Sequence, residues 1–236
     1  MLNMLIPFIL TFLFTSCSLF NCVKGSGNIN TETRPLTDFK KIIINSNANV
    51  YIEQDDYYSV DIEAEENIIP YIKTRIRNDE LIISNKTCLL NQKPINIYIS
   101  SPEFRRIALS SSGKIISKNR ITGNKLDIVI NGSGKAEIDL DVQKLFTELS
   151  GSGKISLRGN AYTNKINLSG SGIIDALECE TDESIINLSG SGICKMNVNE
   201  DLKINISGSG IVEYIGSPDI QSNISGTGRV KKLRSY

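Results

Sequence analysis

The sequence predicts an all-β protein whose fold is a right-handed parallel β-helix, or β-solenoid, with repeats of about 18–20 residues. Three observations predict this fold. A glycine triplet recurs six times at a nearly constant interval, apolar and polar residues alternate on both sides of it, and residues 38–118 contain short β-branched runs separated by Asn and Asp. The alternative is a β-sandwich or β-prism whose strands come from each repeat.

The glycine triplet reads Gly-Ser-Gly in five copies and Gly-Thr-Gly in the last. Successive first glycines are 19, 19, 20, 18 and 18 residues apart, and a degenerate forerunner ends at Gly113. A unit of this length cannot bury enough apolar surface to fold alone, so successive units have to stack. The glycines to which we assign this structural role are Gly132, Gly134, Gly151, Gly153, Gly170, Gly172, Gly190, Gly192, Gly208, Gly210, Gly226 and Gly228.

The residues around each triplet indicate a strand, a bend and a second strand. Leu149, Gly151, Gly153, Ile155 and Leu157 share one parity, which is the two-residue period of a β-strand. This phase places the glycines on the inner side, where the absence of a side chain lets another backbone segment come close. The intervening serines should point outward and stack from coil to coil.

The first half of the chain is also predicted to be strands, but without the triplet. Residues 44–50 have the rhythm of the repeat without its glycines and could form an early coil. Nothing between residues 101 and 125 has the composition of a linker. We therefore expect a single domain over residues 31–236, with a less regular half at 31–118 and a triplet-containing half at 119–236.

The N-terminus has the features of an export signal. The ten apolar residues from Leu5 to Phe14 suit the core of a signal peptide and are too few to span a membrane. Thr15 and Ser16 then precede Cys17, an order that resembles the bacterial lipobox, in which the chain is cleaved before an acylated cysteine. We expect a signal peptide at 1–16, lipid attachment at Cys17 and a tether over 17–30. A plain signal peptide cleaved nearby is the alternative.

Four further cysteines have no Cys-x-x-Cys spacing, which gives no support to a zinc site or a thioredoxin-like motif. Cys194 is predicted to be a small buried residue. An exported chain could form a disulfide, but the sequence does not assign a pairing. The four are Cys22, Cys88, Cys179 and Cys194.

The order of motifs along the chain resembles one known family, the auto-transporter adhesin head domain, or GIN domain, of secreted proteins and lipoproteins of Bacteroidetes. The resemblance implies a β-helical fold and membership of the cell envelope, and it implies no catalytic residue. It covers roughly residues 24–230 and rests on the following segments together with the Leu-Ser-Gly-Ser-Gly series: 24–28, 36–42, 50–54, 60–72, 81–83 and 97–104.

Charge and composition exclude several functions. Lys and Arg number 26, as do Asp and Glu, so a nucleic-acid partner is not expected. The chain has no His, and the triplets match neither the Walker nor the dinucleotide-binding pattern, so no cofactor is expected. Residues 53–66 hold seven acidic residues, which we interpret as a solvated strand face and not a calcium site. The basic residues at 229–234 are expected to protect the open edge of the last coil.

The sequence therefore predicts a non-catalytic lipoprotein of the cell envelope, anchored to the outer membrane on an unspecified side. Its partners would be the membrane, through the N-terminal lipid, and an unidentified envelope or host glycan or protein. An adhesin-like binding module is the first expectation. A purely scaffolding lipoprotein is the alternative, and a polysaccharide-cleaving β-helix enzyme is a weaker one because no coil face repeats an acidic cluster.

Overall fold

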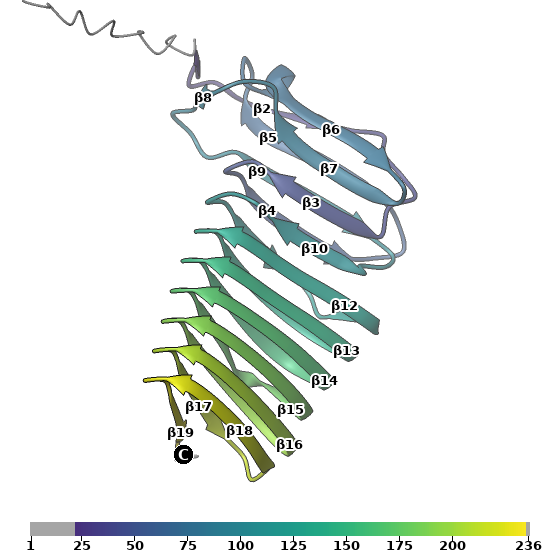
Figure 1. Cartoon of the computed structure of the whole chain (residues 1–236). Coiled ribbons are helices and arrows are strands. Elements are labelled where there is room, and N and C mark those ends of the chain that lie inside the picture. Colours follow the sequence, from purple (N-terminus) through teal and green to yellow (C-terminus); the bar gives the residue numbers. More distant parts are fainter. Residues whose placement is uncertain (1–21, 235–236) are drawn as a thin grey trace, which may run out of the picture.

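The computed structural model describes residues 22–234, and within this range the only helical element is a 3₁₀ turn, η1 (Ile69–Tyr71). The remaining structure is a stack of β-coils (Figure 1). The predicted parallel β-solenoid is confirmed. The strands are β1 (Val23–Lys24), β2 (Ile29–Thr33), β3 (Lys41–Asn45), β4 (Asn49–Gln54), β5 (Ser59–Glu65), β6 (Ile72–Arg77), β7 (Glu80–Asn85), β8 (Leu89–Leu90), β9 (Asn96–Ser101), β10 (Arg106–Leu109), β11 (Lys114–Ser117), β12 (Ile121–Gly132), β13 (Lys135–Gly151), β14 (Lys154–Gly170), β15 (Ile173–Gly190), β16 (Ile193–Gly208), β17 (Ile211–Ile215), β18 (Asp219–Gly226) and β19 (Arg229–Lys232).

Each coil contributes one strand to each of two faces, and in the triplet-containing half the triplet forms the bend between them. The face that precedes the bend, the first face, runs in order through β7, β3, β10, residues 125–132, 144–151, 163–170, 183–190 and 201–208, and β18. The face that follows the bend, the second face, runs from β9 through β4 and β11 to β17 and β19. All of these neighbours pair in parallel.

The stack does not follow the sequence at its N-terminal end. The coil formed by β3 and β4 lies between the coil of β7 and β9 and the coil of β10 and β11. Antiparallel strands then close this end, with β6 on β7, β5 on β9 and β2 on β5. The early coil expected at residues 44–50 is confirmed, whereas its place inside the stack was not predicted.

The core consists of inward-pointing side chains stacked in register. One column passes through Ile130, Leu149, Leu168, Leu188 and Ile206, and each of these residues is at most 3% exposed. Burying one such side chain contributes about 1.5–3 kcal/mol, which is realised only when neighbouring coils are present. The alternation of the sequence thus becomes an apolar interior that runs along the whole stack.

Glycine is required at both positions of the triplet for different reasons. Gly170 has a φ of +107°, and a Cβ atom there would lie 2.5 Å from the carbonyl oxygen of Gly151 in the preceding coil. A Cβ atom at Gly172 would lie 2.6 Å from Cδ2 of Leu149. Between them Ser171 is exposed, and its backbone N–H donates to the Gly151 carbonyl at 3.0 Å.

The tether predicted over residues 17–30 is wrong for residues 22–30, which belong to the folded body. Cys22 forms a disulfide with Cys88, β1 pairs with β8, and β2 pairs with β5. The glycines at 25 and 27 are therefore part of the fold and do not belong to a flexible tether. The signal peptide and Cys17 lie outside the described residues.

A buried carboxylate holds this N-terminal segment in place. The carboxylate of Glu65, a residue that is 1% exposed, accepts the backbone N–H groups of Gly27 at 2.7 Å and of Gln92 at 2.8 Å, and a longer one from Lys93 at 3.3 Å. Burial alone would raise the pKa of Glu65, but these three N–H donors outweigh it and hold the pKa below its usual value. The solvated acidic face predicted for residues 53–66 is therefore wrong at this position.

This geometry predicts a pH dependence of stability. Because the pKa of Glu65 is lower in the folded than in the unfolded chain, its contribution is complete above the unfolded value of about 4.3 and is lost as the pH falls through the folded value. Between pH 7 and pH 3 the urea midpoint of a Glu65→Gln variant should fall less steeply than that of the wild type. Glu32→Gln, at an exposed carboxylate, is the control and should follow the wild type. Parallel curves for all three proteins would exclude this role for Glu65.

The two remaining described cysteines are buried apolar residues. Cys179 and Cys194 are both 0% exposed and free. Burial raises the pKa of Cys179 to about 12 and that of Cys194 further still, so neither thiol is a reactive nucleophile. The prediction for Cys194 is confirmed.

Candidate functional site

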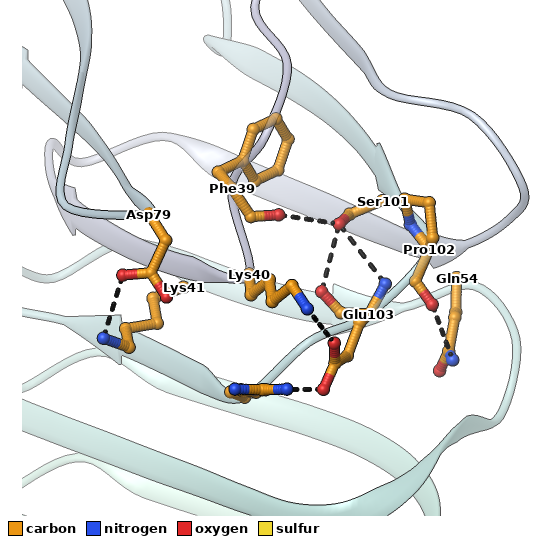
Figure 2. A network of polar contacts seen from close by, with 9 residues as sticks. Phe39, Lys40, Lys41, Gln54, Asp79, Ser101, Pro102 and Glu103 are labelled. Carbon is orange, nitrogen blue, oxygen red and sulfur yellow. Dashed lines mark hydrogen bonds and ion pairs between the residues drawn. The ribbon is translucent and has the colours of Figure 1, made fainter.

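A polar network lies in the N-terminal half, between β3, β9 and β10 (Figure 2). Both carboxylate oxygens of Glu103 are bound, one by Lys40 at 2.6 Å and one by Arg105 at 2.5 Å. Hydrogen bonds from Arg105 and then Lys40 lower the pKa of Glu103, so this carboxylate is ionised and paired. The carboxylate therefore fixes the loop and is not placed as a catalytic acid.

Ser101 is the one buried hydroxyl of this network, and its contacts are structural. It is 0% exposed, and its Oγ lies 3.0 Å from the carbonyl oxygens of both Phe39 and Glu103. Nearby, Gln54 donates to the Pro102 carbonyl at 3.1 Å, and Lys41 binds Asp79 at 3.0 Å (Figure 2). A nucleophile needs an adjacent base and access to substrate, and Ser101 has neither in this arrangement.

The acidic residues of the 53–66 stretch are dispersed among separate partners. Glu53 binds Lys118 at 2.8 Å, Asp61 accepts the Ser59 hydroxyl at 2.6 Å, and Glu63 accepts the Asn96 amide at 2.7 Å. In the part of the chain that the structure describes, no group of three or more Cys, Asp or Glu side chains is placed to hold a metal ion. The same range contains no helix that is long and apolar enough to cross a membrane.

A groove of about 600 Å³ lies on the outer side of the first face, where β12 to β15 pass next to one another. The parallel register places Phe146, Lys165 and Ile185 side by side on successive strands, and Lys144 beside Thr163. Neighbouring strands are about 4.8 Å apart, so these side chains form one continuous lining. We call this surface the Phe146 groove.

The Phe146 groove combines an apolar floor with free positive charge. Ile185 contributes an aliphatic side chain that is 43% exposed. At one end, Asp127 is held by Lys125 at 3.3 Å and by Arg106 at 3.8 Å. Lys144 and Lys165 form no ion pair within residues 22–234, so two ammonium groups flank the phenyl ring without a partner.

A second hollow of about 380 Å³ lies on the same face, closer to the triplets. Its lining is a ladder of asparagines, in which Asn187 donates to Asn167 at 3.0 Å and Asn205 donates to Asn187 at 2.9 Å. Because each amide is used by the next coil, we interpret this ladder as a structural element that supports stacking.

The site residues predicted from the sequence do not form the Phe146 groove. The twelve triplet glycines lie at the bends and line neither hollow, and Cys17 lies outside the described residues. Sequence reasoning missed Phe146, Lys144 and Lys165. Phe146 and Lys165 occupy the same position in successive repeats, but that position holds Phe, then Lys, then Ile185, so no residue type repeats there. The asparagine ladder could have been found, because Asn precedes Leu-Ser-Gly or Ile-Ser-Gly in four repeats.

Comparisons with known proteins find the same fold in putative adhesins of bacteria. A family model described as "Putative auto-transporter adhesin, head GIN domain" matches residues 38–218. A "putative adhesin" from Bacteroides fragilis has 26% identity and a TM-score of 0.84, with 89% of this chain and 100% of that chain covered. A "putative lipid binding protein" from Parabacteroides distasonis has 25% identity and a TM-score of 0.77, with 90% and 99% covered. A search of curated proteins found no match.

Proposed function

The chain belongs to the auto-transporter adhesin head GIN domain family, and we propose that it is an exported, non-catalytic binding module of the cell envelope, anchored through Cys17. The family description and the neighbouring adhesin support a role in binding at the cell surface. The proposal further assigns the ligand to the Phe146 groove.

The observation that carries this assignment is that the aromatic ring of Phe146 lies next to two lysines, Lys144 and Lys165, that form no ion pair within the described part of the chain. A sugar ring packs its C–H face on an aromatic side chain, and ammonium groups bind carboxylate or sulfate substituents by charge-assisted hydrogen bonds. Phe146 supplies the ring and Lys144 and Lys165 supply the charges. The ligand class that fits best is an acidic glycan.

A glycan array probed with the protein tests the assignment. Acidic glycans should be retained and their neutral counterparts should not, and Phe146→Ala should lower the affinity about tenfold, which corresponds to about 1.4 kcal/mol. Tyr57→Ala is a matched control, because this aromatic side chain is 54% exposed and does not line the groove. Absence of any retained glycan or lipid would favour the scaffolding alternative.

A lipid is the second candidate ligand, and the apolar floor of the same groove favours it. Phe146 and Ile185 could contact an acyl chain while the lysines bind an anionic head group. One structural neighbour is described as a "putative lipid binding protein". Sedimentation of a Cys17→Ala chain with vesicles containing anionic lipid would distinguish this candidate, since an acidic glycan site should leave the protein in the supernatant.

The proposed anchor at Cys17 predicts that its removal shifts the protein from the membrane fraction to the soluble fraction. A Cys17→Ala variant should lose metabolic palmitate labelling and move from the membrane to the soluble fraction, because stable anchoring needs the acyl chains of a modified cysteine. Cys22 is already engaged in a disulfide and cannot replace it. Labelling that persists unchanged in the variant would show that Cys17 is not the lipid site.

A further inference from the structure

The two ends of the solenoid differ in how their edges are covered. At the N-terminal end, antiparallel strands β6, β5 and β2 are added to the stack. At the C-terminal end, β18 pairs only with β16 and β19 only with β17, within the described residues (Figure 1). The last coil therefore presents two strand edges with free backbone N–H and C=O groups.

The apolar interior reaches the surface at this open end. Ile220 and Ile224 continue the columns of Leu202 and Ile206 by register, but they are 40% and 41% exposed, whereas the latter two are at most 3% exposed. Val230 continues the column of Val212 on the other face. One further strand placed over the last coil would bury this apolar patch, as each coil buries its neighbour elsewhere.

The charges on the second face indicate which charge the outward side chains of such a strand should have. Outward positions on successive strands read Asp175, Lys195, Glu213 and Lys231, so the signs alternate. Glu213 lies 3.6 Å from Lys195 and 3.7 Å from Lys231. The column ends in a cation whose side chain is 65% exposed, and the next strand in this alternation would place a carboxylate there.

The same charges disfavour pairing of two copies through their β19 strands. β19 carries Arg229, Lys231 and Lys232, and the segment beyond it carries Arg234, so two open ends that met β19 to β19 would bring like charges together. The predicted protection of the edge by basic residues thus acts selectively. It repels basic strands and makes an acidic strand the best-fitting partner.

We propose that the open C-terminal end binds another protein by strand addition to β19, and that the partner segment is extended, with acidic residues alternating with apolar ones. The carboxylates lie opposite Arg229 and Lys231, and the apolar side chains cover Ile220, Ile224 and Val230. This surface is separate from the Phe146 groove. Its occupant is a protein segment, so the inference does not depend on the groove or its ligand.

A labelled eight-residue peptide of alternating Glu and Ile is the probe, and fluorescence anisotropy with the whole protein is the readout. The peptide should bind, and added salt should weaken the binding. Reversing both charges, Arg229→Glu with Lys231→Glu, should lower the affinity about tenfold or more and create binding of a Lys/Ile peptide. Equal binding of the acidic peptide to both proteins would overturn the proposal.

The apolar contact is tested with a matched pair of isoleucines. Ile220→Lys should reduce peptide binding, whereas Ile185→Lys, at a residue of similar exposure in the Phe146 groove, should not. All substituted side chains are at least partly exposed, and unchanged thermal melting curves confirm that the variants fold. Sedimentation of the wild type should show a monomer. A dimer that Ile220→Lys dissociates would show that a second copy occupies the end and would overturn the proposal.

Discussion

Replacing Gly170 by Val is expected to destabilise the protein by about 3 kcal/mol or more, because two effects act together. The residue has a φ of +107°, which a β-branched side chain rarely adopts, and its new Cβ would lie 2.5 Å from the Gly151 carbonyl oxygen. That oxygen belongs to the preceding coil and accepts the Ser171 N–H, so it cannot move away without breaking the ladder. Urea denaturation measures the loss.

Ser171→Ala is the matched control for this variant. The serine is the exposed residue of the same triplet, and a surface change of this kind usually alters stability by less than about 0.5 kcal/mol. In Gly170→Val, amide hydrogen exchange should also become faster in the neighbouring coils, since each coil is stabilised by the next. If Ser171→Ala were the more harmful change, the assignment of the glycines to the inner side of the bend would be wrong.

Removing the disulfide should have the second largest effect. Cys22 and Cys88 are 66 residues apart in the sequence, and a bond that closes a loop of this size typically contributes about 2–4 kcal/mol through the unfolded state. The double variant Cys22→Ser with Cys88→Ser should therefore unfold at a lower urea concentration and should expose β1 and β8 to hydrogen exchange first.

The response to reductant provides a control for the double variant. Reductant should lower the urea midpoint of the wild type to that of the double variant and should leave the variant unchanged, because Cys179 and Cys194 are free and buried. A wild-type midpoint that does not respond to reductant would contradict this contribution of the bond.

The repeating half could be predicted because one constraint is imposed six times. The phase shared by Leu149, Gly151 and Ile155 identifies the inner side, and each new copy of the triplet confirms the period. Local sequence carries this information because coils of 18–20 residues pair with their immediate neighbours. The parallel register and the alternating burial of β13 to β16 agree with it.

The N-terminal half could not be predicted to the same depth, because contacts between distant residues determine it. The coil of β3 and β4 enters the stack beside strands that follow it by about forty to fifty residues. Glu65 lies in a strand of alternating acidic and apolar residues, a pattern that predicts solvated carboxylates. The loop that carries Gln92 folds over Glu65 and supplies N–H donors. Neither the loop nor the pairing of Cys22 has a local signal.

The Phe146 groove escaped prediction for a different reason. Phe146, Lys165 and Ile185 are about twenty residues apart from one to the next and differ in type, so only the register of three strands brings them together. The composition, with few aromatic residues, gave no indication of a glycan-binding surface. Sites formed across a solenoid face need the register before they can be recognised.

The most direct test of a binding module without catalytic activity is the chain length of an acidic polysaccharide before and after incubation with the protein. Uronic-acid polymers should be used with divalent cations present, which polysaccharide-cleaving β-helices could require. The polymer should bind the protein and keep its length. Shortening of the polymer that disappears when one carboxylate of residues 53–66 is changed would contradict the account and identify the protein as an enzyme.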